Sequence, residues 1–340
     1  MNGMSKGITM ADVGRHAGVH QTTVSLALRN DPRIPKATRE RIAEIAKTLG
    51  YRPNPMVSAL ISERRRNSDP GRRSALAFMT ASLNYGDWRQ SRTYALLFEH
   101  LVRHAENLGY GLEEFWLEEP GMTSERMRSI LLNRGIRGII ICPLQGERHC
   151  IDFDFTDFAS IALGYTLQHP AVNLVASDYG ANMSLAIAHL LERGHRRLLF
   201  LTTQHVNARV KHLSLERYLG ERFQQPKKIL APLVREEFER ESLLNDLRRL
   251  RPDAVIVPTG AEYTQTMGFL EEANIGRGKR VMLVNLDQRK NSNETGIIRM
   301  LDAEAAVAVA SVTSNVERAR FGLPESRQTI LIPGRWMDGS

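Results

Sequence analysis

The hydrophobic pattern of the chain changes near residue 74. Before this position, apolar side chains recur every three or four residues, as on amphipathic helices. After it, short apolar runs alternate with longer stretches of helical spacing, which predicts parallel strands covered by helices. The predicted strands are 75–79, 138–142, 160–163, 198–201, 254–257 and 281–284, and the predicted helices include 94–108, 181–192, 240–250 and 303–319. These elements are too numerous for one small sheet, so we expect two lobes.

The first 51 residues predict three short helices. One helix ends at Gly18 and a second begins almost at once, which is the helix-turn-helix pattern, whose second helix enters the major groove of DNA. Ala17, Val24 and Ala27 are predicted to pack between the helices. A proline-containing turn over 31–35 separates a third helix over 36–49, which Gly50 is expected to end.

Charge is distributed unevenly between these two regions. Residues 1–73 contain 14 basic and 6 acidic side chains, whereas the remaining residues contain 32 of each sign. The whole excess of +8 therefore lies in the first fifth of the chain. Positive charge concentrated on one small helical domain indicates a polyanionic partner, and double-stranded DNA fits the helix-turn-helix pattern.

Composition and motifs argue against several other classes. The chain is 42% hydrophobic and 25% charged, which is ordinary for a soluble globular protein. Neither an apolar run near 18 residues nor a signal-peptide core is present, so we expect a cytoplasmic, nucleoid-associated protein without a membrane contact. Cys142 should be a buried strand residue, and no disulfide with Cys150 is expected. The sequence has no metal-ligand spacing, phosphate loop or nucleophile elbow, so we expect no metal, no cofactor and no enzymatic activity.

Between the two regions lies a linker over 52–73. Its prolines favour an extended start, and Asn54 can cap a short helix over 56–63 that has Pro55 at its first position. Arginine clusters follow at 64–66 and 72–73.

Residues 8–60 resemble the LacI/GalR family of transcriptional repressors, and weaker similarity continues to the last residues. The matching motifs are Ala17-Gly18-Val19, Thr23-Val24-Ser25, Pro32-Arg33-Ile34, Thr38-Arg39-Glu40-Arg41-Ile42, Leu49-Gly50-Tyr51-Arg52-Pro53-Asn54, His189 to Arg197, Arg251-Pro252-Asp253-Ala254 and Ile330-Leu331-Ile332-Pro333. The resemblance implies a helix-turn-helix head (1–51), a hinge helix and linker (52–73) and an α/β core like periplasmic sugar-binding proteins (74–340). It also implies a homodimer whose two core lobes comprise about 74–175 with 298–325, and about 176–297 with 326–340. The chain would cross between the lobes near Val175, Ile297 and Glu325.

If the second helix lies in the major groove, its first turn faces the bases. Gln21 can pair with adenine N6 and N7, and Thr22 can bond a base or touch a thymine methyl. The alternative is that both contact only phosphate or solvent. The other residues predicted to contact DNA, mostly at phosphates, are Thr9, Thr23, Ser25, Arg29, Arg33 and Asn54.

Three positions carry further expectations about DNA. Leu26 stands where the family commonly has an arginine that reads guanine, so it either touches a thymine methyl or fills space; we expect an A·T preference there. Leu60 matches the leucine that the family wedges into the minor groove, with packing on its dimer mate as the alternative. Ser58 stands where an arginine is often found, which puts one minor-groove contact in doubt.

Residues that follow apolar strands are candidates for an effector site between the lobes. Asp287 matches a family aspartate that binds sugar hydroxyls, and Lys211 stands where many members carry an arginine. Trp88 is expected to stack on a sugar face. The full set is Asn84, Asp87, Trp88, Arg209, Lys211, Asn285 and Asp287.

We therefore expect a repressor, connected with carbohydrate metabolism, whose dimer binds a palindromic operator and responds to a sugar-like effector. A transport-type sugar-binding protein is disfavoured by the DNA-binding head, and an enzyme by the missing motifs. A regulator whose core binds a protein partner, or no small ligand, stays an alternative.

Overall fold

The computed structural model describes residues 8–28, 34–51, 74–146, 148–273, 281–288 and 293–339. The predictions for the linker 52–73 lie outside these residues. Three helices form the N-terminal head: α1 (Met10–Ala17), α2 (Gln21–Leu28) and α3 (Lys36–Thr48). Gly18 and Gly50 follow α1 and α3 with φ of 65° and 67°, a left-handed conformation that favours glycine. The predicted ends of both helices are thereby confirmed.

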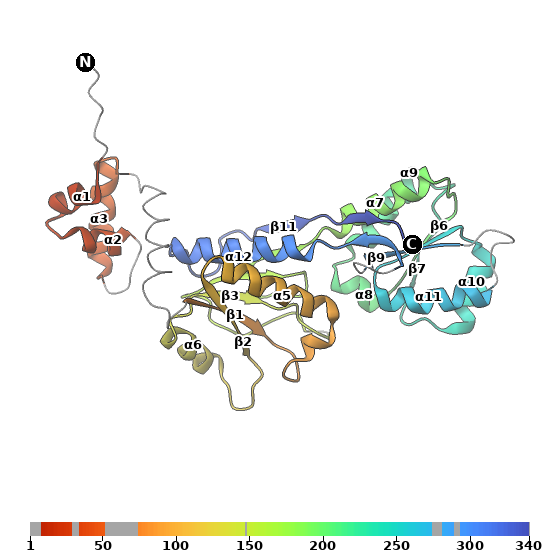
Figure 1. The fold of residues 1–340 in the computed structure, drawn as a ribbon, viewed down its shortest axis with the longest axis horizontal. Helices are drawn as coiled ribbons and strands as arrows, with labels where there is room; N and C mark the ends of the chain where they lie inside the picture. The colour runs from red at the N-terminus through yellow and green to blue at the C-terminus, as the bar shows by residue number, and fades with distance from the viewer. Residues whose placement is uncertain are drawn as a thin grey trace, which may run out of the picture.

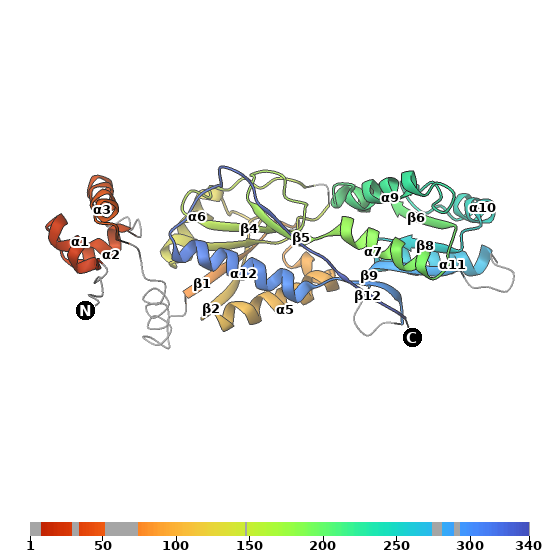
Figure 2. The same cartoon turned by 90° about the horizontal axis from the view of Figure 1, so that it is seen from above.

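The first lobe is a six-stranded parallel sheet with helices on both faces (Figures 1 and 2). Its strand order is β11-β5-β4-β3-β1-β2. The strands are β1 (Ser74–Thr80), β2 (Tyr110–Trp116), β3 (Gly138–Ile141), β4 (Ala159–Leu163), β5 (Asn173–Ser177) and β11 (Thr329–Ile332). The helices are η1 (Asp87–Gln90), α5 (Arg92–Asn107), α6 (Ser124–Asn133) and α12 (Leu301–Glu317). Side chains of α5 and α12 pack into one apolar core, and those of α6 into the core on the opposite face.

The second lobe repeats this plan with strand order β12-β10-β9-β8-β6-β7, in which only β12 is antiparallel to its neighbour. Its strands are β6 (Leu198–Thr203), β7 (Leu233–Arg235), β8 (Ala254–Val257), β9 (Met282–Gln288), β10 (Thr295–Ile298) and β12 (Arg335–Met337). Its helices are α7 (Tyr179–Glu192), α8 (Gln204–Arg209), α9 (Leu213–Gln224), α10 (Arg240–Leu250) and α11 (Gly260–Ala273). The fold is therefore an all-α head joined to a two-lobed α/β core, as the sequence predicts.

The chain crosses between the lobes in three places. The first two crossings join β5 to α7 and β10 to α12. The third joins β11 to β12 and follows Ile332, so the predicted position near Glu325 is wrong. The reason is strand pairing: Thr329 to Ile332 pair in parallel with Leu174 to Ser177 of β5 and extend the first sheet. The segment 326–332 therefore belongs to the first lobe.

None of the helices within the described ranges combines the length and the apolar character needed to span a bilayer.

Candidate functional site

Gly14 of α1 lies against the turn that leads into α2 and against Val24 of α2. A β-carbon added to Gly14 would lie 2.7 Å from the backbone oxygen of Val19 and 3.5 Å from Cγ2 of Val24. Glycine is therefore required for this approach, because any larger residue would push the turn away from α1. Ala17, Val24 and Ala27 are buried in the head core, which confirms their predicted packing role.

Thr9 is the N-cap residue of α1. Its Oγ1 accepts a hydrogen bond from the backbone N–H of Asp12 at 3.3 Å, and its own backbone N–H donates to Asp12 Oδ2 at 2.9 Å. This reciprocal capping box satisfies two donors at the start of the helix. The hydrogen bonds from Thr9 hold the pKa of Asp12 below its ordinary value. The hydroxyl of Thr9 also donates to Asp12 at 2.6 Å, so this residue first of all fixes α1.

Gln21 and Thr22 are exposed on the first turn of α2. His20, which is not among the predicted DNA contacts, precedes them and contacts Thr22 twice. Its Nδ1 lies 3.4 Å from the Thr22 backbone nitrogen and 2.9 Å from Thr22 Oγ1. Because the backbone N–H can only donate, Nδ1 acts as the acceptor here, and the Thr22 hydroxyl also donates to it. The oxygen of Thr22 then keeps lone pairs that can accept from a base.

The other predicted DNA contacts are only partly described. Thr23 and Leu26 are half-buried on α2. Within the described head, Leu26 is not among the apolar side chains that pack against the core. The side chain of Ser25, and the residues Arg29, Arg33, Asn54, Ser58 and Leu60, lie outside the described part of the chain. Their proposed contacts stay predictions.

Arg209, at the end of α8, links the second lobe to the first. Its Nη2 donates to Tyr94 Oη at 2.9 Å and to the carbonyl oxygen of Leu144 at 3.1 Å, and Nη1 lies 3.5 Å from the carbonyl oxygen of Gly146. Tyr94 lies on α5, and Leu144 follows β3. Arg209 therefore lies at the junction of the lobes, but its donors are directed at protein acceptors.

Asp287 of β9 lies at the same junction. Thr93 Oγ1, from the first lobe, donates to Asp287 Oδ2 at 3.5 Å, and Arg299 Nη1 lies 3.9 Å from Asp287 Oδ1. The Asp287 side chain keeps 26% of its surface exposed, so a ligand can still reach it. Its backbone N–H donates to Oδ1 of Asn285 at 2.9 Å.

A charged network that was not predicted from the sequence surrounds the second crossing. Arg299 donates to Glu304 at 3.0 and 3.2 Å, and its guanidinium lies 5.9 Å from the ring centre of Tyr179. Burial alone would lower the pKa of Arg299, but Glu304, Tyr179 and Asp287 raise it well above its ordinary value. The Arg299 and Glu304 side chains are only 11% and 2% exposed. The only sequence signal was the five-residue spacing of opposite charges at a predicted crossing.

Two predicted effector residues are engaged inside the protein. Trp88 is 2% exposed, packs against Phe78 and Phe98, and donates its indole N–H to Glu114 at 2.7 Å. The prediction that it stacks on a sugar face is therefore corrected, because the first-lobe core covers both the ring and its donor. The prediction that Asn285 contacts the effector is also corrected, because this side chain is buried.

Asn285 is fully buried. Its Nδ2 donates to Glu294 at 2.8 Å, and its Oδ1 accepts from Asp287. Instead of contacting a ligand, Asn285 holds the end of β9 and thereby orients the backbone of Asp287.

Asn84, Asp87 and Lys211 are not brought into the inter-lobe contacts described above. Asn84 donates to Asp87 Oδ2 from its backbone N–H at 3.1 Å and from its side-chain amide at 3.2 Å. This is a local turn at the start of η1, in which the amide of Asn84 and the carboxylate of Asp87 are hydrogen-bonded to each other. Lys211 is exposed in a left-handed conformation with φ of 52°, directly after α8.

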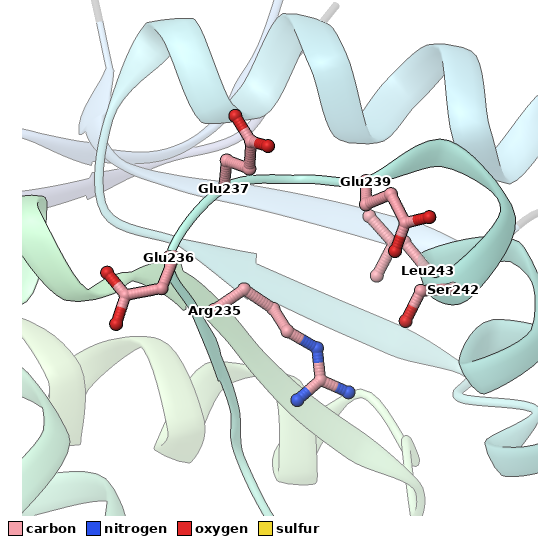
Figure 3. A pocket seen from close by; sticks show the side chains of 6 residues that line it. All are labelled: Arg235, Glu236, Glu237, Glu239, Ser242 and Leu243. Atoms are coloured by element: carbon pink, nitrogen blue, oxygen red, sulfur yellow. The ribbon is translucent and has the colours of Figure 1, made fainter.

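The acidic segment after β7 lines a cavity of about 240 Å³ in the second lobe (Figure 3). Figure 3 shows that the carboxylates of Glu236, Glu237 and Glu239 point in different directions. Arg235 is paired with Asp246. Within the described residues, no group of histidine, cysteine and acidic side chains could hold a metal ion.

These features define a class of protein: a helix-turn-helix head joined to a periplasmic-binding-protein-like core. The head, over residues 9–54, matches the model of the bacterial regulatory proteins of the lacI family. This match places the head with the lacI family of bacterial regulators, as the resemblance of its motifs indicated.

Two transcriptional regulators with similar sequences are only moderately identical to this chain. The maltose regulon regulatory protein MalI of Escherichia coli K12 is 28% identical over 59% of this chain and 55% of its own length. The transcriptional regulator GalR of the same organism is 24% identical over 58% of this chain and 54% of its own length. The chain thus matches little more than half the length of these relatives.

Solved structures support the fold over a longer range. The lac repressor dimer bound to operator and the anti-inducer ONPF has a TM-score of 0.56 at 17% identity, with 98% of both chains covered. The regulator CelR in complex with cellobiose has a TM-score of 0.53 at 17% identity, covering 97% of this chain and 98% of its own. A LacI-type protein of Alkaliphilus metalliredigens with D-xylulofuranose has a TM-score of 0.52 at 16% identity, covering 78% of this chain and 98% of its own.

Proposed function

We propose that this protein is a cytoplasmic transcriptional repressor whose homodimer binds a palindromic operator, and that a small sugar-like effector at the junction of its lobes modulates this binding. The observation that carries the proposal is the α1–α2 pair. Gly14 holds the two helices in close contact, and Gln21 and Thr22 stand exposed on the first turn of the second helix. This is the arrangement that reads base edges in the major groove.

Each DNA-contacting residue has a separate proposed role. Gln21 pairs with adenine through its amide, and Thr22, whose proton is engaged by His20, accepts from an amino group of a base. Leu26 makes an apolar contact with a thymine methyl, because it is half-buried and lies outside the packed head core. Leu60 wedges into the minor groove. The phosphate contacts are assigned to Thr9, Thr23, Ser25, Arg29, Arg33 and Asn54, with Ser58 beside the wedge.

Two heads on a two-fold dimer bind two inverted half-sites, because closed symmetry requires the same contacts on both. The similar lac repressor is a dimer bound to its operator, which supports this reading. The spacing of the half-sites then follows from the distance between the two second helices.

The proposed effector site is built around Arg209 and Asp287, with Lys211 at its edge. A cation and a carboxylate at the junction suit a polyhydroxylated ligand, since each hydroxyl both donates and accepts. Similar proteins carry sugars, namely cellobiose and D-xylulofuranose. The bonds from Arg209 to the first lobe are those that the ligand would replace or reinforce.

Coupling between the sites follows from the same contacts. A ligand shifts the balance between lobe arrangements only if it binds one of them more tightly. An effector that bonds Asp287 and Arg209 changes the links to Thr93 and Tyr94 directly. The movement would reach the heads through the first lobe.

Selection of random duplex DNA with the full chain tests the function. We expect an inverted repeat with adenine opposite Gln21 and an A·T pair opposite Leu26. Gln21→Ala should weaken binding to the selected site by about 1–3 kcal/mol without changing binding to random DNA. Enrichment of no symmetric sequence, or equal weakening on both DNAs, would contradict the proposal.

A second candidate is a regulator whose core binds a protein partner or no small ligand. It is favoured by the burial of Trp88 and Asn285 and by the mutual pairing of Asn84 with Asp87, which leave few free groups at the junction. Calorimetric titration of the full chain with a panel of sugars and nucleosides separates the two readings. Saturable heat that Asp287→Asn abolishes supports the effector site, whereas no heat with any member supports the second candidate.

A further inference from the structure

A polar cavity lies in the first lobe, at the edge of its sheet opposite to the inter-lobe junction. It has a volume of about 220 Å³ and lies between α12 and the amino-terminal ends of strands β4, β5 and β11. The carboxyl-terminal end of α12, which lines the cavity, points away from the second lobe (Figure 2). The cavity is lined by Ser160, Ile161, Asn173, Ser311, Ser314, Asn315, Arg318, Arg320, Gln328 and Ile330.

The charged side chains of this lining are all positive. The lining includes two exposed arginines, Arg318 and Arg320, and no carboxylate. Among the described residues neither guanidinium has an acidic partner, whereas Arg128 and Arg137 of the same lobe are paired with Asp157. Two unpaired guanidiniums at one small cavity attract an anion, since planar fork donors match the geometry of an oxyanion.

The backbone at the end of α12 fixes where the two arginines start. The backbone N–H of Arg320 donates to the carbonyl oxygen of Asn315 at 2.9 Å, and that of Ala319 donates to Val316 at 3.1 Å. This is the Schellman arrangement, in which the residue after the cap is usually glycine. Here it is Ala319 with φ of 50°, a strained conformation for a residue with a β-carbon. The turn therefore places Arg318 and Arg320 on either side of a rigid bend.

Neutral donors complete the lining. Asn173 accepts the backbone N–H of Gln328 through Oδ1 at 2.8 Å, which leaves its Nδ2 as a donor. The hydroxyl of Ser314 and the side-chain amides of Asn315 and Gln328 have no partner within the described ranges. A helix C-terminus also stabilises a nearby cation through its dipole. The dipole accounts for one arginine but not for a carboxylate-free cavity surrounded by donors.

We propose that this cavity binds a free tetrahedral oxyanion, namely inorganic phosphate. Its volume is below the roughly 300 Å³ of common small-molecule pockets, which suits one such group. Arg318 and Arg320 supply the charge, and Asn173, Ser314 and Gln328 supply neutral hydrogen bonds. The site is distinct from the effector site between the lobes.

The test measures binding of inorganic phosphate to the full chain by calorimetry and by thermal unfolding, with sodium chloride at equal ionic strength as reference. Phosphate should bind the wild-type chain and raise its Tm. The double variant Arg318→Gln/Arg320→Gln should bind phosphate at least about tenfold more weakly. Arg248→Gln is the matched control, because Arg248 is also an exposed arginine in the last turn of a helix, α10, and should bind as the wild type does.

A second variant keeps the test decisive if the double variant folds poorly. Ser314→Asp retains both arginines but places a carboxylate in the lining, and it should weaken phosphate binding by at least about tenfold as well. Equal binding by all variants, or no binding to the wild type up to about 10 mM, overturns the proposal. A duplex-binding arm distinguishes a free oxyanion from the phosphates of the DNA backbone. If phosphate does not bind and the double variant loses more affinity for random duplex DNA than Arg248→Gln does, the arginines contact the DNA backbone and the free-oxyanion site is refuted.

Discussion

Substituting Arg209 should release the two lobes from each other. In Arg209→Ala the guanidinium that donates to Tyr94 and to the carbonyl oxygen of Leu144 is lost, and both acceptors belong to the other lobe. The long contact to Gly146, at 3.5 Å, contributes little. The closed arrangement therefore loses two hydrogen bonds of good length from a charged donor.

The magnitude follows from these two bonds. Hydrogen bonds to charged groups contribute about 1.5–3 kcal/mol each, and the half-buried position of Arg209 favours the lower end. We expect Arg209→Ala to shift the balance between closed and open lobes by about 3 kcal/mol, which is roughly 140-fold. Tyr94→Phe removes one of the acceptors only, and its effect should be about 1.5 kcal/mol.

Distances between spin labels, one in each lobe, measure this balance. Exposed Ser129 on α6 and Glu271 on α11 are suitable sites after replacement by cysteine. Cys150 is exposed and has to be replaced by serine, whereas Cys142 is buried and burial raises the pKa of its thiol, so it should not react.

Arg209→Ala should broaden or lengthen the distance distribution in the ligand-free protein, and the double variant with Tyr94→Phe should add little to it, since both changes remove the same bond. An unchanged distribution in Arg209→Ala would show that these bonds do not hold the lobes together. Fully additive effects of the two substitutions would refute the shared contact.

Three further predictions concern stability. Gly14→Ala should destabilise the head by about 1–2 kcal/mol, because the clash of its β-carbon with the Val19 carbonyl outweighs the gain in helix propensity; denaturant unfolding that shows a more stable head would contradict the packing argument. Glu304→Gln should cost about 3 kcal/mol, since it leaves Arg299 buried without its nearest carboxylate, and an unfolding free energy within about 0.5 kcal/mol of wild type would show that Arg299 is solvated. Burial raises the pKa of Glu262, so its folded state binds a proton more readily than the unfolded state and its contribution should become more favourable as the pH falls from neutral through the raised pKa. Glu262→Gln should flatten this dependence in thermal unfolding between pH 7 and pH 4; an unchanged profile would show that Glu262 does not cause it.

At the inter-lobe site, the sequence predicted some of the residues at the junction but not which side chains are buried. Asp287 follows a strand and matches a family aspartate, Arg209 lies two residues before the family position Lys211, and both Asp287 and Arg209 lie at the junction. Trp88 was selected by the same reasoning, but its ring is covered by Phe78 and Phe98. Position after a strand says that a side chain is near the sheet edge, but only packing decides whether it turns outward.

The edge strands of the first sheet could not be predicted from the hydrophobic pattern for a related reason. Strand β3 is buried throughout and was predicted as an apolar run, whereas the edge strand β2 carries polar residues and is mostly half-buried. The third crossing was misplaced because the pairing of β11 with β5 joins segments about 155 residues apart. Apolar periodicity reports burial, and it does not identify the neighbouring strand.

The sequence by itself determined the head. Its caps, its glycine turns and its core are contacts within about 45 residues, so local spacing was enough to place α1, α2 and α3 and to expose Gln21 and Thr22. The tertiary structure alone decided the rest of the candidate sites. The bond from Arg209 to Leu144, the network of Arg299 and the oxyanion cavity each join segments that are distant in the chain or close only after a crossing. The physical reason is that the partner of a long polar side chain is set by which surfaces pack together, and no periodicity along the chain records that choice.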